Sequence, residues 1–433
     1  MPRRCLIIST CFAALIAVAA RADTLTVPGD FSTIQAAIDA SSNGDEIAVA
    51  PGVYGSNTAN VVDMKGRAVR LYATGGPDVT FIDGNDGTIR RRGILCQSGE
   101  TNATVIEGFT IRNCFPTWYD WNENELIEIW EFFGGGMWNR GGSSPRVVGC
   151  RFENNSAEYG GAICNWDQDD LDNRPRLENC TFTGNTAGFG VGGAIYANGS
   201  WMELFDCTFV GNSAYFGGAI TSMQLASNPT LVRCHFEQNN ATMSGGALYT
   251  EQSAPSQNRC TYKQNSAGRD GGAIFSAGQG VSSLIPTYVQ CEFNGNLAGD
   301  EGGAVHNFSI SPAFLECAFR GNVAIDGGAI YNWNGANPEL LNNVFCQNGP
   351  DDIDGNWTGE GNQFNETCDN DDDCPADLNG DGEVGGADLT IILSNWGCVD
   401  QGCEGDLTGD DLVGGADLTV VLSNWGGCGS SGN

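Results

Sequence analysis

The sequence is poor in positive charge and in histidine. Its 433 residues include 20 lysine or arginine residues and two histidines, against 53 aspartate and glutamate residues, and the formal net charge is -33. So acidic a chain repels phosphate groups, which argues against nucleic acid or an anionic membrane as a partner. The two histidines, His235 and His306, offer little material for a zinc site or for a serine–histidine–aspartate triad.

Long apolar runs are absent beyond residue 20. No later segment reaches the roughly twenty apolar residues that cross a membrane. At the start of the chain, Arg3 and Arg4 precede an apolar run from Leu6 to Ala20, and the residues that follow fit the small-residue cleavage rule of secretory signals. We therefore expect residues 1–22 to be a signal peptide and the mature protein to be extracellular, either free or attached to the cell surface.

Stretches with helical periodicity are also scarce, and a repeated phrase takes their place. It reads Cys-x-Phe-x-x-Asn-x-Ala, then a short polar gap, then Gly-Gly-Ala-Ile, and its clearest copy runs from Cys207 to Ile220. Such a period is typical of stacked supersecondary units. Copies begin 26 to 31 residues apart, at Cys150, Cys180, Cys207, Cys234, Cys260, Cys291 and Cys317.

Each copy holds two short alternating runs and no segment long enough for a helix, which predicts strands. We therefore predict an all-β fold, a right-handed parallel β-helix over residues 23–350 with one coil per copy. Equivalent side chains then stack about 4.8 Å apart, in internal ladders of Cys, Phe and Asn. The ladder cysteines should stay reduced, because a disulfide prefers β-carbons about 3.5 to 4.5 Å apart.

The beginning of the solenoid carries a helix signal. The residues Ser32 to Gln35 read as a capping box with Ser32 as the cap, which predicts a short helix that closes the open end. The run from Val27 to Ile38 resembles the start of pectin-methylesterase-type β-helices, and this resemblance implies a pectin-lyase-like fold without implying an activity. The repeats over residues 109–350 resemble those of the polymorphic outer-membrane adhesins, although no membrane barrel follows them.

Two features outside the ladders are candidates for ligand binding. Residues 115–133 interrupt one coil with a loop rich in aromatic and acidic residues, and long loops in compact domains are often functional. Aromatic residues also occur at outward positions of the second strand of several coils. The alternatives are that the loop is a flap packed on the solenoid and that the outward rings only stabilise the sheet. Because aromatic rings stack on sugars, we predict a polysaccharide-binding face made of Trp118, Tyr119, Trp121, Trp138, Tyr196, Tyr249, Phe275 and Tyr331.

The composition changes after residue 350. Residues 351–433 hold nineteen carboxylates and no lysine or arginine, and we expect an acidic linker over 351–373 and a small α-helical domain over 374–428. Residues 377–388 follow the calcium loop of EF type, and a second, weaker copy begins at Asp406. The expected ligands of Ca²⁺ are Asp377, Asn379, Asp381, Glu383, Asp388, Asp406, Thr408, Asp410 and Asp417.

Each calcium loop precedes an apolar stripe with helical spacing. We expect these stripes to form the core of the domain, from Leu389, Ile392, Leu393 and Trp396 with their copies Leu418, Val421, Leu422 and Trp425. The tandem arrangement resembles a dockerin type I module, which implies a cohesin-like receptor as partner. Because the units are duplicated, equivalent cysteines should pair alike, and we predict the disulfides Cys374–Cys398, Cys403–Cys428 and Cys346–Cys368.

These observations favour a protein that binds polysaccharide or a surface partner through its outer face and is anchored by the calcium-dependent module. One alternative is a polysaccharide-degrading lyase, esterase or hydrolase, because dockerin modules commonly carry carbohydrate-active enzymes. The other is a purely structural surface rod. No catalytic residue is assigned, since carboxylate pairs occur throughout the sequence. The basic cluster of Arg90 to Arg92 is interpreted as a solvated turn rather than as the arginine of a lyase.

Overall fold

The chain divides into two compact units, residues 1–363 and residues 364–433. In the computed structural model, the described residues are 22–85, 91–116, 132–166, 173–224, 227–278, 285–365, 368, 376, 378, 383–399, 403, 405–408 and 412–427. The predicted signal peptide, apart from its last residue, therefore lies outside the described residues. No helix among the described residues has the length and apolar character that crossing a membrane requires.

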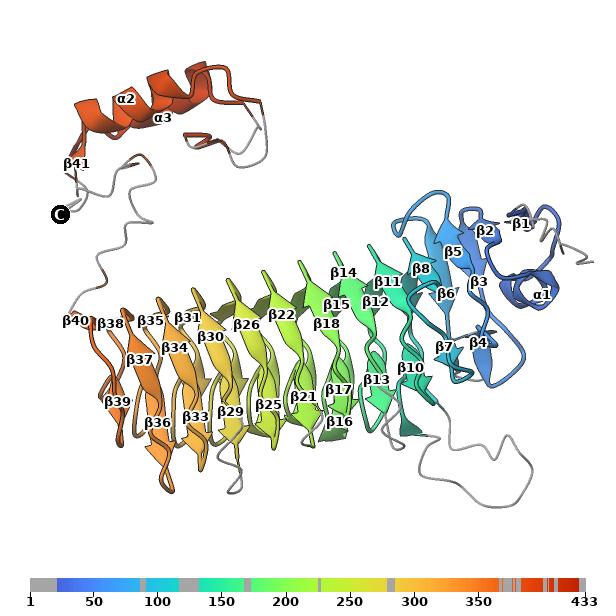
Figure 1. Cartoon of the computed structure of the whole chain (residues 1–433), viewed down its shortest axis with the longest axis horizontal. Coiled ribbons are helices and arrows are strands. Elements are labelled where there is room, and N and C mark those ends of the chain that lie inside the picture. Colours follow the sequence, from blue (N-terminus) through green and yellow to red (C-terminus); the bar gives the residue numbers. More distant parts are fainter. Residues whose placement is uncertain are drawn as a thin grey trace, which may run out of the picture. The chain divides into compact units, whose positions relative to one another are not determined.

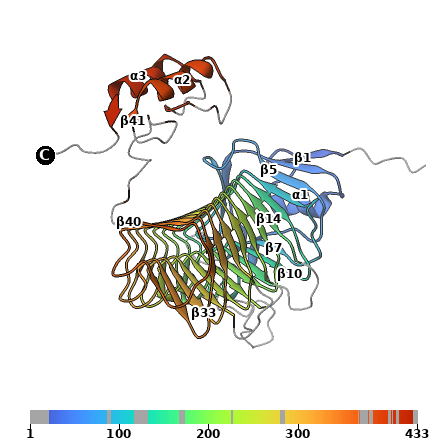
Figure 2. The ribbon, with the colours of Figure 1, turned by 60° about the vertical axis from the view of Figure 1, so that its left-hand side comes forward.

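The first unit is a parallel β-helix in which successive coils add one strand to each of three long sheets (Figures 1 and 2). Sheet A consists of β1 (Thr24–Val27), β2 (Glu46–Val49), β5 (Arg70–Ala73), β8 (Val105–Glu107), β11 (Arg146–Val148), β14 (Arg176–Glu178), β18 (Glu203–Phe205), β22 (Thr230–Val232), β26 (Ser256–Asn258), β30 (Thr287–Val289), β34 (Ala313–Leu315) and β37 (Glu339–Leu341). Sheet B consists of β3 (Gly52–Tyr54), β6 (Thr80–Asp83), β9 (Thr110–Arg112), β12 (Arg151–Glu153), β15 (Thr181–Thr183), β19 (Thr208–Val210), β23 (His235–Glu237), β27 (Thr261–Lys263), β31 (Glu292–Asn294), β35 (Ala318–Arg320), β38 (Val344–Cys346) and β40 (Gln363–Asn365).

Sheet C carries the outer face on which the candidate site lies. It consists of β4 (Asn60–Asp63), β7 (Arg92–Cys96), β10 (Met137–Arg140), β13 (Ile163–Trp166), β17 (Ile195–Asn198), β21 (Ile220–Met223), β25 (Leu248–Glu251), β29 (Ile274–Ala277), β33 (Val305–Phe308), β36 (Ile330–Trp333) and β39 (Ile353–Asp354). A short fourth sheet consists of β16 (Thr186–Val191), β20 (Ser213–Phe216), β24 (Asn240–Ser244), β28 (Ser266–Ala267) and β32 (Leu297–Ala298). The predicted all-β solenoid with one coil per repeat is confirmed.

The predicted internal ladders are present. The rings of Phe209 and Phe236 stack with centroids 4.7 Å apart and an interplanar angle of 5°, and the same arrangement continues from Phe152 to Phe345. Burial raises the pKa of the Cys114 and Cys150 thiols, as expected for thiols that act as small apolar side chains. The ladder cysteines are buried and unbridged, as predicted: Cys150, Cys180, Cys207, Cys234, Cys260, Cys291 and Cys317.

The corners of each coil are made by single residues in the left-handed conformation. In one coil, Arg233 (φ 51°) precedes the ladder residue Cys234, and Gln238 (φ 53°) precedes the ladder residue Asn239. The turn is therefore made by the residue before the ladder asparagine and not by that asparagine. The asparagine side chain replaces the backbone pairing that is lost at the corner, because Asn239 Oδ1 accepts the backbone N–H of Asn212 from the preceding coil.

The paired glycines have two different roles. Gly245 has a φ of +72°, a left-handed conformation that glycine adopts without steric cost. Gly246 lacks that conformation but lies against the next coil, where a Cβ atom would stand 2.0 Å from the carbonyl oxygen of Gly272. The second glycine of each pair is therefore required by the approach of two backbones.

The helix α1 (Ile34–Ala40) lies at the N-terminal end of the solenoid, with Ile34, Ala37 and Ile38 buried as predicted. Its cap is Thr33, whose side chain accepts the N–H of Ala36, so the assignment of Ser32 as the cap was wrong. The Gln35 amide pairs with both backbone groups of Asp63 on the edge strand β4. The helix thus covers the first coil and satisfies part of an open sheet edge.

The solenoid extends beyond the predicted boundary at residue 350. Strand β39 pairs with β36, and β40 is the last strand of sheet B. Much of the segment predicted as an acidic linker, residues 351–373, therefore belongs to the last coil, because its backbone continues the parallel pairing.

The second unit contains α2 (Gly386–Ser394) and α3 (Gly415–Ser423), with β41 (Glu383–Val384) antiparallel to β42 (Gly426–Gly427). Its core is smaller than predicted. Ile392 and Val421 are buried against Val384 and Val413 from the loops. The residues predicted as core but found exposed are Leu393, Trp396, Leu422 and Trp425.

The disulfides of the second unit also differ from the prediction. Cys398 is bonded to Cys403, with Cα atoms 6.1 Å apart, so the predicted pairs Cys374–Cys398 and Cys403–Cys428 are wrong. The bond joins the end of the first repeat to the start of the second instead of closing each repeat on itself. Cys346 and Cys368 are each disulfide-bonded.

Candidate functional site

The outer face of sheet C is not uniformly open. Trp138 and Tyr196 point away from the solenoid core, as predicted, but they are only 6% and 4% exposed. They pack in a second apolar cluster with Leu95, Phe133 and Cys164. Their predicted role as an exposed sugar platform is therefore wrong for the described structure.

The side chains that cover these rings belong to the residue immediately before each glycine pair, which we call the covering position. Phe133 lies there in one coil, and its ring is 4.7 Å from that of Trp166 and 6.0 Å from that of Trp138. Tyr159 has the same position in the next coil and packs 5.4 Å from Tyr196. Large side chains at this position therefore lie over the first part of the outer face.

Arg92 lies on β7, next to β10, and contacts the same apolar cluster. Its guanidinium donates to the carbonyl oxygens of Phe133 and Gly134 and to Asn60 Oδ1, and it lies 4.7 Å from the ring centroid of Trp138. Arg91 is also buried. The interpretation of this basic cluster as a solvated turn was wrong for these two residues.

The covering position changes character further along the solenoid. The residues before the glycine pair are Phe133, Tyr159, Val191 and Phe216 in the earlier coils, and Ser244, Asp270, Glu301 and Asp326 in the later ones. The polar residues leave Tyr249, Phe275 and Tyr331 half-buried rather than fully covered. Among the described residues of the predicted aromatic face, those that remain partly open lie between β25 and β36.

The rings on this part of sheet C form one continuous row, which we call the aromatic row: Tyr249, Phe275, His306 and Tyr331. Tyr249 and Phe275 stack with centroids 5.1 Å apart and planes 6° apart. The ring of His306 follows at 4.9 Å and that of Tyr331 at 5.1 Å. In-register parallel pairing of β25, β29, β33 and β36 produces this spacing.

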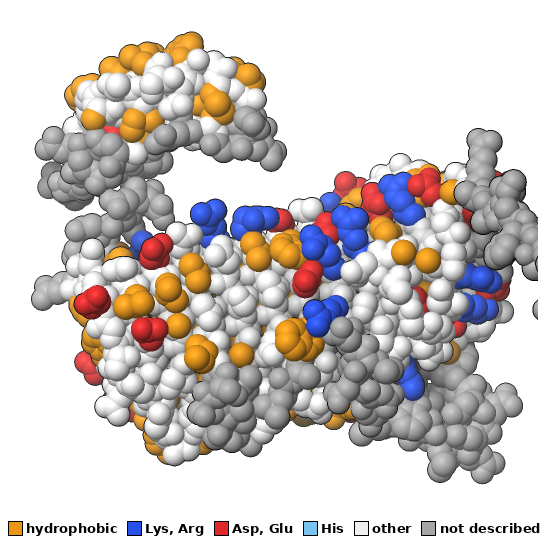
Figure 3. All heavy atoms as spheres, viewed as in Figure 1, with side chains coloured by type: hydrophobic (Ala, Val, Ile, Leu, Met, Phe, Trp, Pro, Cys, Tyr) orange, Lys and Arg blue, Asp and Glu red, His pale blue; other side chains and the backbone are white. Residues whose placement is uncertain are grey.

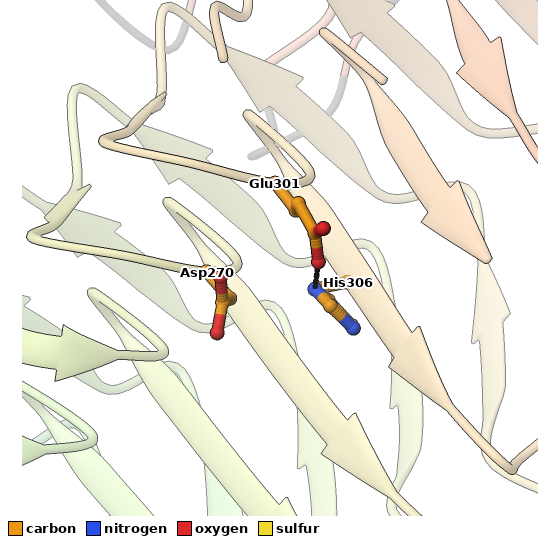
Figure 4. Close-up of side chains that lie close together, drawn as sticks. All are labelled: Asp270, Glu301 and His306. Carbon is orange, nitrogen blue, oxygen red and sulfur yellow. Dashed lines mark ion pairs between the residues drawn. The ribbon is translucent and has the colours of Figure 1, made fainter. Parts of the chain in front are cut away.

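Two carboxylates from the covering position meet the histidine of the row (Figure 4). Potential ligand atoms of Asp270, Glu301 and His306 all lie within 4.8 Å of one another. His306 Nδ1 is 3.6 Å from Glu301 Oε2, and Ser244 Oγ donates to Asp270 Oδ2 over 3.3 Å. His306 is 2% exposed and Asp270 is 7% exposed.

Burial sets the electrostatics of this cluster. It lowers the pKa of His306 to about 4, with a further contribution from the positive charge of Arg269. It raises the pKa of Asp270 and of Glu301, although Tyr331 donates a hydrogen bond that opposes the shift at Glu301. At neutral pH the imidazole is therefore uncharged and both of its nitrogens are available for interaction.

His306 lies at an outward position in register with Tyr331, but sequence reasoning missed the cluster. The signal was the equivalent position of Asp270 and Glu301 immediately before their glycine pairs, in successive coils. His306 follows Glu301 by five residues, on the strand that the glycine pair opens. No residue in the repeat phrase marks the covering position, so the phrase does not single out these two acids.

The remaining predicted binding residues lie in the interrupting loop. Trp118, Tyr119 and Trp121 are outside the described residues, and of this loop only Phe115, Pro116, Phe132 and Phe133 are described. The prediction for the loop tryptophans and tyrosine therefore stays a prediction.

The calcium loops are described only in part. Asp377, Asn379, Asp381 and Asp410, and the side chain of Glu383, lie outside the described residues. Asp388 is buried, and its two oxygens accept the backbone N–H groups of Leu378 and Gly385 from its own loop.

In the second loop, Asp417 accepts the backbone N–H groups of Leu407, Thr408 and Gly414 and the hydroxyl of Thr408. Burial raises the pKa of Asp417, but these hydrogen bonds outweigh it and hold the pKa below its usual value. In both loops the last carboxylate therefore accepts backbone N–H groups from described residues of its own loop.

Comparison with known proteins bears on the fold. The sequence matches the family described as "Right handed beta helix region" over residues 53–298. No curated protein matches it. Among solved structures, a family 28 exopolygalacturonase of Yersinia enterocolitica is similar to 80% of this chain and 78% of its own, with 10% identity and a TM-score of 0.32. The family match, which covers more than half of the sequence, agrees with the parallel coils described above, and the chain belongs to the right-handed β-helix family.

Proposed function

We propose that the protein is an extracellular β-helix that binds an extended polysaccharide across the outer face of sheet C, between β25 and β36. The observation that carries this proposal is the aromatic row, in which Tyr249, Phe275 and Tyr331 remain partly open beside the carboxylates of the covering position. Partly open rings on a rigid sheet offer apolar surface to the faces of sugar rings at little entropic cost.

The regular spacing of the row suits a polymer with a short repeat. The rings follow one another every 4.9 to 5.1 Å along the solenoid axis. Asp270 Oδ1 is buried and has no hydrogen-bond partner among the described residues, and such an acceptor favours a hydroxyl donor. The acidic surface around the row favours an uncharged or cationic chain over a polyanion.

Replacing Phe275 with alanine should weaken the binding free energy for the polysaccharide by about 1 to 3 kcal/mol. This is the range for stacking of a nucleobase on one aromatic side chain, which we take as a guide for a sugar ring. The matched control is Tyr72→Ala, which removes a half-buried ring from sheet A. Affinity electrophoresis of the full-length protein through gels containing uncharged xylan measures both, and gels containing the polyanions pectin or alginate should retain the protein less. If both variants are retained equally by every polymer that retains the unmodified protein, the aromatic row has a structural role only.

Polysaccharide cleavage is the second candidate function. Asp270 and Glu301 present carboxylate oxygens within 4.8 Å of each other, close to the roughly 5 to 5.5 Å of retaining glycosidases. Raised pKa values at both residues suit a general acid. Release of reducing or unsaturated sugar during the same binding experiment distinguishes an enzyme from a binding protein.

We also propose that the second unit anchors the protein through Ca²⁺ and a cohesin-like receptor. Support comes from the two carboxylates that accept backbone N–H groups of their own loops and from the exposed apolar residues of the duplicated helices. Figure 3 shows hydrophobic side chains on the visible face of this unit. The exposed residues occupy equivalent positions, Leu393 with Trp396 on the first repeat and Leu422 with Trp425 on the second. A receptor could therefore bind either repeat in the same way.

Calcium titration should reveal two classes of site in the full-length protein. The first loop should bind more tightly, because Thr408 and Asp411 replace the favoured position-3 oxygen ligand and turn glycine in the second. Isothermal titration calorimetry of Asp388→Ala should show loss of the tighter class, and Asp417→Ala should show loss of the weaker one. The reverse assignment, or no calcium uptake by the unmodified protein, would contradict the proposal.

A further inference from the structure

His306 is a buried side chain that the fold leaves without a hydrogen-bonding role. It is 2% exposed, and neither ring nitrogen has a hydrogen-bond partner among the described residues. A buried polar group left unpaired costs about 1 to 3 kcal/mol, so an apolar ring would suit this position better for stability alone. The ring is held in place by Phe275 on one side and Tyr331 on the other.

The groups nearest to this histidine are oxygen donors. Glu301 Oε2 lies 3.6 Å from Nδ1, which is longer than a hydrogen bond. Asp270 Oδ1 is buried and also has no hydrogen-bond partner among the described residues. Figure 4 shows the Glu301 carboxylate directed at His306 and Asp270 on the adjacent coil, and one potential ligand atom of each residue lies within 4.8 Å of the other two.

The distances match those of a coordinated ion. Ligand atoms that each lie about 2.0 to 2.2 Å from a tetrahedral ion stand roughly 3.3 to 3.6 Å apart. The histidine and glutamate atoms already have this separation, and all three ligand atoms lie within 4.8 Å. Small rotations about side-chain bonds are needed to bring all three ligand atoms within about 3.6 Å of one another. Glu301 is only partly buried and has room for such a rotation.

We propose that Asp270, Glu301 and His306 form a binding site for a divalent transition-metal ion, with Zn²⁺ as the representative ion. An imidazole nitrogen with two carboxylates suits zinc and its neighbours better than calcium, which takes six to eight oxygen ligands. Two negative charges balance the ion, and the three protein ligands leave a position for water or for a ligand oxygen.

The inference does not depend on the proposed polysaccharide binding. An ion at this point also changes the interpretation of the carboxylate pair, because carboxylates that coordinate a metal are not free to act as a general acid and a nucleophile. Occupancy of the site therefore argues against hydrolysis by Asp270 and Glu301. Glycan retention and metal binding are separate measurements, so either proposal can fail while the other stands.

The test uses the full-length protein, stripped of metal with a chelator and then saturated with Ca²⁺ so that the loops of the second unit are filled. Zn²⁺ binding is measured by calorimetry, and Co²⁺ is added separately as a spectroscopic probe. The test variant is His306→Asn. The matched control is His235→Asn, because His235 is the other histidine and also has a neighbouring carboxylate, Glu237, at 3.4 Å on the outer face of sheet B.

The unmodified protein and His235→Asn should each bind one Zn²⁺ in addition to the Ca²⁺ already bound. With Co²⁺ in place of Zn²⁺, both should develop the intense visible absorption of low-coordinate Co²⁺. His306→Asn should bind the ion at least about 100-fold more weakly, since even loss of an outer-shell partner costs 10- to 100-fold. Asp270→Asn preserves side-chain volume and should also weaken Zn²⁺ binding. It therefore tests the site even if His306→Asn folds poorly. Equal Zn²⁺ affinity in the unmodified protein and in both site variants, or no Co²⁺ band in the unmodified protein, would overturn the proposal.

Discussion

Replacing Asn239 with alanine should lower the free energy of unfolding by about 3 to 6 kcal/mol. The side chain donates to the Phe209 carbonyl and to Asn265 Oδ1, and it accepts from the backbone N–H and the side-chain amide of Asn212. Asn239 is fully buried, so alanine takes the shared acceptor away from the backbone N–H of Asn212 and from one N–H of its side-chain amide. Each unpaired buried group costs about 1 to 3 kcal/mol, and the smaller side chain adds a void.

The neighbouring residue provides the control for this change. Asn240 is exposed, and its side chain donates to Ser266 Oγ on the neighbouring coil. Asn240→Ala should therefore change stability by about 0.5 kcal/mol or less. Denaturant unfolding followed by circular dichroism compares the two variants with the unmodified protein. Similar midpoints for the two variants would mean that the asparagine ladder does not hold adjacent coils together.

Replacing Gly246 with alanine should destabilise the solenoid by about 3 kcal/mol or more. The added Cβ atom would lie 2.0 Å from the Gly272 carbonyl oxygen and 2.5 Å from that of Ser266. Both atoms belong to the backbone of the next coil, so no side-chain rotation relieves the overlap and the two coils must separate locally. Overpacking that side chains can partly absorb already costs about 1 to 3 kcal/mol.

Gly188→Ala is the matched control for the glycine change. A Cβ atom added at Gly188 would meet no other atom within 4 Å, and the backbone there is outside the left-handed region. Alanine at this position should leave stability unchanged or raise it slightly, because it reduces the freedom of the unfolded chain. Thermal unfolding of both variants measures the difference. A Gly246 variant as stable as the Gly188 variant would contradict the close approach of the two backbones.

Asn239 and Gly246 are buried in the inner wall of the solenoid, whereas the candidate sites lie on the outer one. The coils from Cys150 to Cys317 repeat the same ladder residues inside, apart from Tyr262 at one phenylalanine position. The outer face of sheet C varies from coil to coil, and between β25 and β36 partly open rings lie beside the unpaired polar atoms of Asp270 and His306. Function in such a solenoid depends on departures from the repeat.

The repeat by itself determined the fold and the interior. A period of 26 to 31 residues with Cys, Phe and Asn at constant offsets allows one stacked arrangement, because each coil buries its apolar face only against its neighbours. The stacking of Phe209 on Phe236 and the unbridged state of Cys207 follow from the in-register spacing of parallel strands. These properties are local and repeated, so sequence reasoning reaches them.

The tertiary structure decided what the outer residues do. Trp138 and Tyr196 obey the same alternation as Phe275 and Tyr331, yet they are buried because Phe133 and Tyr159 from the covering position lie over them. The same position brings Asp270 and Glu301 to His306, and the ends of the two small repeats come close enough to join Cys398 to Cys403. Burial and proximity of this kind depend on how neighbouring segments pack against one another. The spacing of residues within one repeat does not predict that packing.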